Sequence, residues 1–221
     1  MNGEPPVRVV LRPIGSPLTV GMSGLLIASL VQSGLDLGWV GKAETAKVGI
    51  ILIAVPFVLQ LLASVFSYLA RDGATGAAVG VLATTWLALG VVHIVSRPGA
   101  VSAALGLLLL GAGAMLALSA AVIAGAKPLP AGVFLAAALR FLLAALYELS
   151  AVGFWQDVAG VLGLVITAVA AYCVLAFELE GLHHRPVLPT LRRSLGRPAP
   201  IGARVEHLGA YAQEPGVREV M

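Results

Sequence analysis

Charged side chains, aromatic side chains and cysteine are all scarce in this chain of 221 residues. Only 11% of the residues are charged and 6% are aromatic, and Cys173 is the single cysteine. One cysteine excludes an internal disulfide and argues against a thiolate metal cluster. So little charge, beside 59% hydrophobic residues and a mean hydropathy of +0.96, excludes a soluble globular protein.

Long apolar runs fill the chain instead. Between Leu18 and Phe177, short polar joints separate six apolar stretches, each about long enough to cross ~30 Å of hydrocarbon as a helix. The stretches are Leu18–Leu35, Lys47–Leu69, Ala77–Val95, Val101–Ala124, Ala131–Tyr147 and Val158–Phe177. Runs of Leu, Ala, Val and Gly this long indicate helices rather than barrel strands. The prediction is an all-α polytopic membrane protein, built as a six-transmembrane-helix bundle.

The same pattern predicts the domain organisation. We expect a cytoplasmic N-terminal segment at residues 1–17, one transmembrane domain at 18–181 and a basic, disordered cytoplasmic tail at 182–221. The tail is rich in Arg, Pro and Gly and has no apolar period. Within the second stretch, Pro56 should kink or locally unwind the helix.

Basic residues are distributed unequally between the two predicted sides. Six helices put both termini on one side, which holds Arg8, Arg12, Arg71, Lys127, Arg185, Arg192, Arg193 and Arg197, against Lys42, Lys47 and Arg97 on the other. The positive-inside rule therefore predicts cytoplasmic termini in a bacterial inner membrane. Because topology explains the positive charge, no nucleic-acid partner is expected. The outer joint Glu148–Asp157 carries Phe154 and Trp155 where an interfacial aromatic belt would lie.

Arg140 is the exception among the charges of the apolar region. The other charged residues between 18 and 177 fall in joints or at helix ends, but Arg140 lies near the middle of the fifth stretch. A charge at that depth costs about 3 kcal/mol or more, so it should face a cavity or a partner. Its planar guanidinium group can donate two hydrogen bonds at once to a carboxylate, which favours an anion-binding site. The alternative is a neutralising pair with Glu148 or Asp157, or hydrogen bonds to helix carbonyls.

Catalytic and metal-binding motifs are missing from the sequence. It has no H-E-x-x-H, G-x-S-x-G or P-loop motif, so we expect no enzyme activity, no cofactor and no metal site. His93 is interpreted as an interfacial histidine or a proton relay. The small residues around Gly106–Gly113 and Gly160–Gly163 indicate either close packing within one bundle or contacts between subunits.

Three blocks of residues have a spacing shared with a known family. They are Ala159-Gly160-Val161-Leu162-Gly163-Leu164 with Tyr172 and Val187-Leu188-Pro189; Gln60 with Ala63, Tyr68 and Trp86; and Ser16-Pro17-Leu18-Thr19. In this spacing, over residues 13–190, the chain resembles the succinate–acetate permease family, also called the acetate uptake transporters. It departs from the family where Ile14-Gly15 replaces an Asn-Pro pair and where Ser23, Leu82 and Thr85 replace aromatic residues.

The resemblance implies a homo-hexameric transporter or channel for a small monocarboxylate, with acetate favoured and proton coupling left open. It also implies a substrate pathway in which Pro17 and Leu18 form the mouth, Gln60 and Trp86 the middle, and Leu82 and Leu142 the narrow hydrophobic constriction. Arg140, which has no counterpart in the family, would add a local positive charge. The pathway residues are Pro17, Leu18, Gln60, Leu82, Trp86, Arg140 and Leu142. Two alternatives stay open, namely a channel for a neutral solute such as urea or a short amide, and a non-transporting membrane partner protein.

Overall fold

The computed structural model describes residues 16–183, 185 and 187–191, and all the regular structure in them is helical. Residues 1–15 of the predicted N-terminal segment and most of the predicted tail lie outside the described residues. The elements are α1 (Pro17–Asp36), a 3₁₀ turn (Lys42–Glu44), α2 (Thr45–Leu52), a π-helical turn (Ile53–Phe57), α3 (Val58–Leu69), α4 (Gly73–Val95), α5 (Ala103–Ile123), α6 (Pro128–Ser150) and α7 (Gly153–His183).

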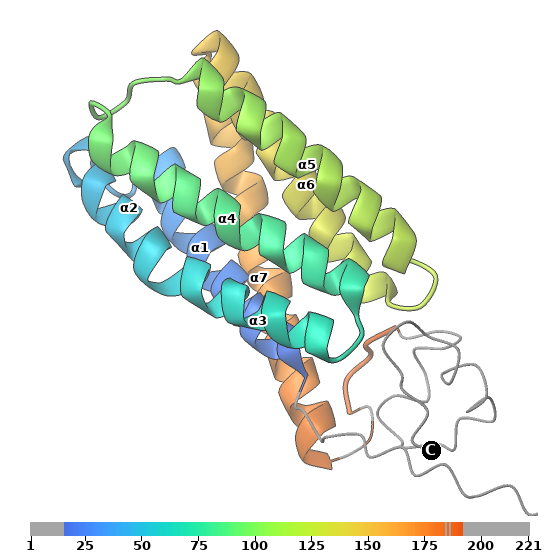
Figure 1. The fold of residues 1–221 in the computed structure, drawn as a ribbon. Coiled ribbons are helices and arrows are strands. Elements are labelled where there is room, and N and C mark those ends of the chain that lie inside the picture. The colour runs from blue at the N-terminus through green and yellow to red at the C-terminus, as the bar shows by residue number, and fades with distance from the viewer. Residues whose placement is uncertain (1–15, 184, 186, 192–221) are drawn as a thin grey trace, which may run out of the picture.

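These elements form six candidate membrane spans, because the 3₁₀ turn, α2, the π-turn and α3 join into one continuous helix, Lys42–Leu69. The predicted all-α class with six long apolar helices is confirmed. The spans run up and down, so that the start of α1 and the end of α7 lie at the same end of the bundle (Figure 1). We call this the terminal end. The opposite end, which carries the α1–α2, α4–α5 and α6–α7 joints, is the distal end.

Contacts between pairs of helices hold the bundle together. The most extensive contacts pair α5 with α6 and α1 with α7, while α3 packs on α4 and on α1. α1 is the most buried span, since it also contacts α2 and α4. A spanning helix with this much of its surface inside the protein is well placed to line an internal cavity.

Pro56 produces the distortion expected of it. A proline has no N–H to donate and clashes with the carbonyl one turn earlier, so an α-helix cannot pass through it unchanged. The span instead forms a π-helical turn over Ile53–Phe57, between α2 and α3. The span continues beyond the turn without interruption, and the predicted local unwinding is confirmed.

The glycine-rich helix faces contact other helices of the same chain. A Cβ atom placed on Gly106 would lie 2.8 Å from the side chain of Leu149, and one on Gly160 would lie 2.8 Å from that of Leu37. Gly163 likewise lies against α1 and α6. Of the two interpretations left open, these contacts support close packing within one bundle. Gly111 differs, because a Cβ atom there would meet nothing within 4 Å.

The predicted outer joint Glu148–Asp157 is wrong in its extent. α6 continues to Ser150 and α7 begins at Gly153, so that the break consists of Ala151, which has a left-handed φ of 57°, and Val152. The polar residues that suggested a loop are helical residues at the distal end.

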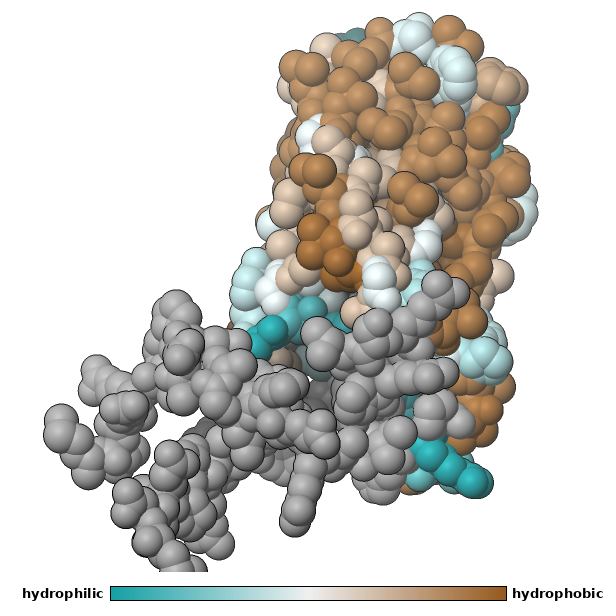
Figure 2. Space-filling model, turned by 90° about the vertical axis from the view of Figure 1, so that its right-hand side faces the viewer, coloured by the Kyte–Doolittle hydropathy of each residue, from teal (hydrophilic) through white to brown (hydrophobic). Residues whose placement is uncertain are grey.

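The outer surface of the bundle is strongly apolar. Figure 2 shows hydrophobic side chains over most of the coloured surface of the bundle that is visible from this side. Large apolar side chains of α5, α6 and α7 are exposed, among them Leu107, Leu118, Val122, Leu135, Leu139, Val161 and Val165. Such a surface suits a hydrocarbon environment or contacts with other spanning helices, and it agrees with the multi-pass membrane prediction.

Candidate functional site

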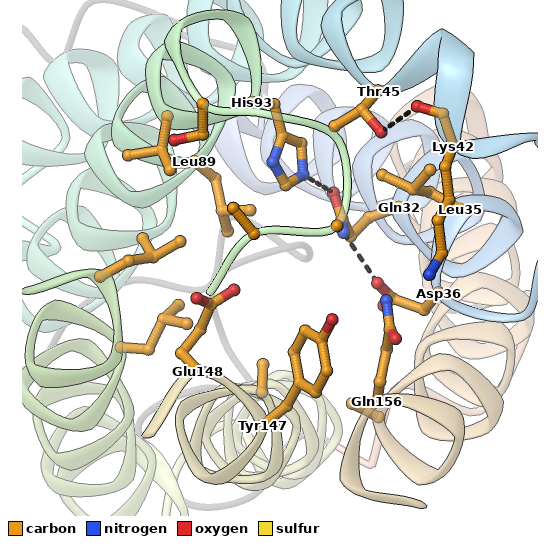
Figure 3. Close-up of a pocket in the computed structure, with 18 of the residues that line it drawn as sticks. Gln32, Leu35, Asp36, Lys42, Thr45, Leu89, His93, Tyr147, Glu148 and Gln156 are labelled. Atoms are coloured by element: carbon orange, nitrogen blue, oxygen red, sulfur yellow. Dashed lines mark hydrogen bonds between the residues drawn. The ribbon is translucent and has the colours of Figure 1, made fainter. Parts of the chain in front are cut away.

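A cavity of about 290 Å³ lies at the distal end of the bundle. Residues from α1, α2, α4, α5, α6 and α7 and from the α1–α2 and α4–α5 joints line it. We call it the vestibule. Its polar and charged lining residues are Gln32, Asp36, Lys42, Thr45, His93, Ser96, Arg97, Arg140, Tyr147, Glu148 and Gln156. In Figure 3, His93, Tyr147, Glu148 and Gln156 are arranged around its opening.

A chain of hydrogen bonds crosses the vestibule wall from α4 to α1. The Gln32 side-chain amide donates to Asp36 Oδ1 at 2.8 Å, and Gln32 Oε1 lies 3.0 Å from His93 Nε2 (Figure 3). Because the Gln32 amide nitrogen is engaged with Asp36, its oxygen is the acceptor toward His93, and His93 Nε2 must carry the proton. His93 is therefore not isolated, since it connects to the carboxylate at the vestibule floor.

Arg140 lies at that floor and is paired with Asp36. Its Nη2 donates to Asp36 Oδ2 at 3.0 Å, and its Nε donates to the carbonyl oxygen of Ala159 in α7 at 3.2 Å. The two side chains are only 4% and 10% exposed. A pair this deep places a fixed dipole, and not a lone cation, at the base of the cavity.

The neutralising acid is therefore not one of those expected. Asp36 holds Arg140, whereas Glu148 accepts a hydrogen bond from the backbone N–H of Ser102 at 2.6 Å, at the start of α5. The expected hydrogen bond from Arg140 to a helix carbonyl is present at Ala159.

Two aromatic rings pack together beside Arg140, and one of them, Phe141, also lines the vestibule. The guanidinium carbon of Arg140 lies 5.7 Å from the centroid of the Trp86 ring, within cation–π range. Phe141 meets Trp86 edge-to-face, with 5.5 Å between the ring centroids. Both rings are buried, and the Trp86 indole N–H has no hydrogen-bond partner among the described residues.

Apolar side chains close the bundle beneath this floor. Leu82 lies one helical turn from Trp86 toward the terminal end, and it is fully buried with Met22, Leu25 and Phe134. At the terminal end, the pocket lined by Leu18, Lys127, Pro130, Phe177 and Thr190 holds only about 10 Å³. The vestibule is thus open toward the distal end and sealed toward the terminal end.

The structure brings together some of the predicted pathway residues and separates others. Arg140 lines the vestibule and Trp86 packs against its guanidinium, while Leu82 is buried one helical turn before Trp86 in α4. Gln60 is buried lower down, where its amide donates to the carbonyl of Gly21 at 3.2 Å. Leu142 faces away from them and packs against Gly113 of α5.

Pro17 and Leu18, the predicted mouth, begin α1 at the terminal end. Leu18 lines the small pocket there.

Sequence reasoning missed Asp36 and Gln32 of α1, and Phe141 of α6, as residues of the floor. One signal was present, because Gln32 and Asp36 are four residues apart and therefore face the same way on a helix. Among the residues that the structure describes, no group of three or more His, Cys, Asp or Glu side chains is placed to hold a metal ion.

A comparison with solved structures finds a similar fold in the bacterial acetate channel SatP. The TM-score is 0.72 at 19% sequence identity, over 80% of this chain and 99% of that one. A scan against protein-family models gives no match, and no curated protein sequence matches. SatP belongs to the succinate–acetate permease family, so the resemblance seen in the sequence motifs is confirmed at the level of the fold.

Proposed function

We propose that this chain forms a membrane passage for a small monocarboxylate, with acetate as the first candidate. The observation that carries the proposal is Arg140, a guanidinium held at the floor of a cavity inside a bundle of spanning helices. Ionisable groups within spanning helices mark ion and substrate pathways, because their burial is costly. The guanidinium fork is suited to carboxylates, and here it already holds one, that of Asp36. The shared fold with an acetate channel supports the same substrate class.

In the proposed pathway, a monocarboxylate enters the vestibule from the distal end and reaches Arg140. It then passes Trp86, Leu82 and Gln60 toward Pro17 and Leu18. Phe141 takes the constricting place that was expected of Leu142, because Phe141 is the residue that meets Trp86. The apolar seal beneath the floor must open for passage, so the described conformation is a closed one.

A neutral solute is the second candidate. Asp36 cancels the charge of Arg140, so the floor also suits an uncharged molecule with hydrogen-bonding groups, such as urea or a short amide. The two candidates differ in what the floor binds. A carboxylate needs the guanidinium, whereas an amide can use the pair as it stands.

Flux through proteoliposomes tests the proposal. We expect the purified full chain to carry labelled acetate faster than protein-free vesicles and to carry urea and acetamide much more slowly than acetate. Faster flux of urea or acetamide would move the assignment to the neutral-solute channel. The absence of flux for all three solutes would favour a non-transporting partner protein.

We also propose that both termini are cytoplasmic, in a bacterial inner membrane, and that the chain assembles as a homo-hexamer. The first proposal is supported by the sequence, in which eight basic residues fall on the predicted side of the termini and only three, Lys42, Lys47 and Arg97, fall on the other. The second is supported by the family resemblance and by the open space at Gly111 on the apolar face of α5.

A further inference from the structure

Asp36 is bound at the vestibule floor much as a free carboxylate would be. One of its oxygens accepts from the Arg140 guanidinium at 3.0 Å, and the other accepts from the Gln32 amide at 2.8 Å. Both contacts are nearly out of reach of solvent. The protein thus supplies its own anion to a site whose donors come from α1 and α6.

This site has more donors than Asp36 uses. A guanidinium has five N–H groups, and the hydrogen bonds of Arg140 engage its Nε and Nη2 but leave Nη1 without a partner in the described structure. Two further buried donors nearby, the Ser33 hydroxyl and the Trp86 indole N–H, also have no partner there. Ser33 and Arg140 both approach the same point on Gly163, and Trp86 lies against the Arg140 guanidinium.

Unpartnered donors of this kind need an explanation, because a buried polar group without a hydrogen bond is costly. Of these donors, only Arg140 belongs to a residue that lines the vestibule, so a ligand there would accept from its Nη1 group, and a carboxylate has two oxygens that only accept. Asp36 does not occupy Nη1, because its oxygens accept from Arg140 Nη2 and from the Gln32 amide.

The vestibule offers the Asp36 side chain a second polar environment. It is the last residue of α1, its side chain lines the vestibule, and Lys42 and Arg97 line the same cavity. If Asp36 turns toward these cations, its carboxylate leaves Arg140 without being left alone in an apolar interior. A second carboxylate can then take its place on the guanidinium.

We propose that Asp36 is a tethered occupant of a carboxylate site centred on Arg140, and that a permeating monocarboxylate binds by displacing it. The proposal rests on the proposed function for the identity of the permeant. It assigns Asp36 the role of a selectivity residue, because an incoming anion must bind Arg140 better than Asp36 does. Spherical anions such as chloride, which cannot form the paired hydrogen bonds of a carboxylate, are rejected by this competition.

Chemical rescue tests the site directly. Asp36→Ala removes the tethered carboxylate and leaves space beside an uncompensated Arg140, so the melting temperature of the detergent-solubilised full chain should fall. Formate and acetate should raise it again, while acetamide, which has the shape of acetate without its charge, should not. Asp72→Ala is the matched control, because it breaks the Asp72–Lys127 ion pair at the terminal end, and carboxylates should not rescue it.

Flux supplies the second measurement. Without its competitor, Arg140 should bind acetate more tightly, and the half-saturating acetate concentration of Asp36→Ala should fall roughly tenfold if Arg140 is free in about a tenth of wild-type molecules. Chloride should inhibit flux in this variant and not in the wild type. Asp36→Asn, which keeps the volume of the side chain, gives the same comparison if the alanine variant does not fold.

The outcomes separate the two proposals. No rescue of Asp36→Ala, equal rescue by acetamide, or an unchanged half-saturating concentration would overturn the role of Asp36 while wild-type acetate flux still supported the function. If the wild type carries no acetate, the proposed function fails, but rescue that is specific to carboxylates would still establish the site on Arg140.

Discussion

Replacing Arg140 by methionine should destabilise the protein more than most single substitutions in the bundle. Methionine fills a similar volume but donates no hydrogen bond, so Asp36 would lose its guanidinium partner while it remained almost buried. Removing one partner of a buried ion pair costs about 3–5 kcal/mol. The lost cation–π contact with Trp86 adds about 1 kcal/mol. For a chain of this length, the sum corresponds to a melting temperature lower by on the order of 10 °C.

A double-mutant cycle shows whether this loss comes from the ion pair. In Arg140→Met combined with Asp36→Asn, no charge is left stranded, and the double variant should regain most of the stability because a buried pair can be replaced by neutral groups at little cost. Arg140→Lys should fall between the wild type and Arg140→Met, since it keeps the charge but not the fork. The measurement is thermal unfolding of the detergent-solubilised protein.

Two results would refute this reasoning. The first is an Arg140→Met protein that melts within about 2 °C of the wild type, a shift worth about 1 kcal/mol or less for this chain length. The second is a double variant whose loss equals the sum of the two single losses, which would mean that Asp36 and Arg140 contribute independently.

Three further outcomes are expected. Gly163→Ala should lower the melting temperature and impair flux, because its Cβ atom would lie 2.6 Å from Arg140 Nε; an unaffected variant would mean that the floor is loosely packed. A Cβ atom at Gly111 would meet nothing within 4 Å, so Gly111→Leu should leave monomer stability unchanged but weaken the proposed hexamer in native mass spectrometry if α5 forms the subunit contact. Reporter fusions after Lys127 should report the cytoplasm and fusions at Ala151–Val152 the outside, and the reverse pattern would contradict the proposed orientation.

The helices could be predicted because each depends on local sequence alone. A stretch of about 20 apolar residues is long enough to span a bilayer whatever lies beside it, so all six spans could be located from composition. The effect of Pro56 could be predicted for the same reason, since its missing N–H disturbs any helix that contains it. The helix ends near Glu148 could not be found in this way, because polar residues that face an internal cavity look the same in sequence as the polar residues of a loop.

The ion pair could not be predicted, because it joins residues 104 positions apart. Asp36 ends α1, where a charge usually faces water, and the sequence does not indicate that α6 and α7 cover it. The positions of Leu142 and Phe141 have a simpler cause. Neighbouring residues on a helix point about 100° apart, so Phe141 lines the cavity while Leu142, one position later, packs against α5.

The π-turn at Pro56 sets the rotational phase of the second span. In an uninterrupted α-helix, the buried faces of α2 (Thr45, Val48, Gly49 and Leu52) and of α3 (Gln60, Ala63, Ser64 and Ser67) would point roughly 60° apart at 3.6 residues per turn. A π-turn is wider and advances the chain through a smaller angle per residue, which brings the two faces back into line. Gly49 can then approach Gly90 of α4 while Gln60 still reaches Gly21 of α1. The π-turn therefore sets the direction in which the buried face of α3 points. A regular α-helix over the same residues, with none removed, would turn Gln60 by roughly 60° relative to the buried face of α2.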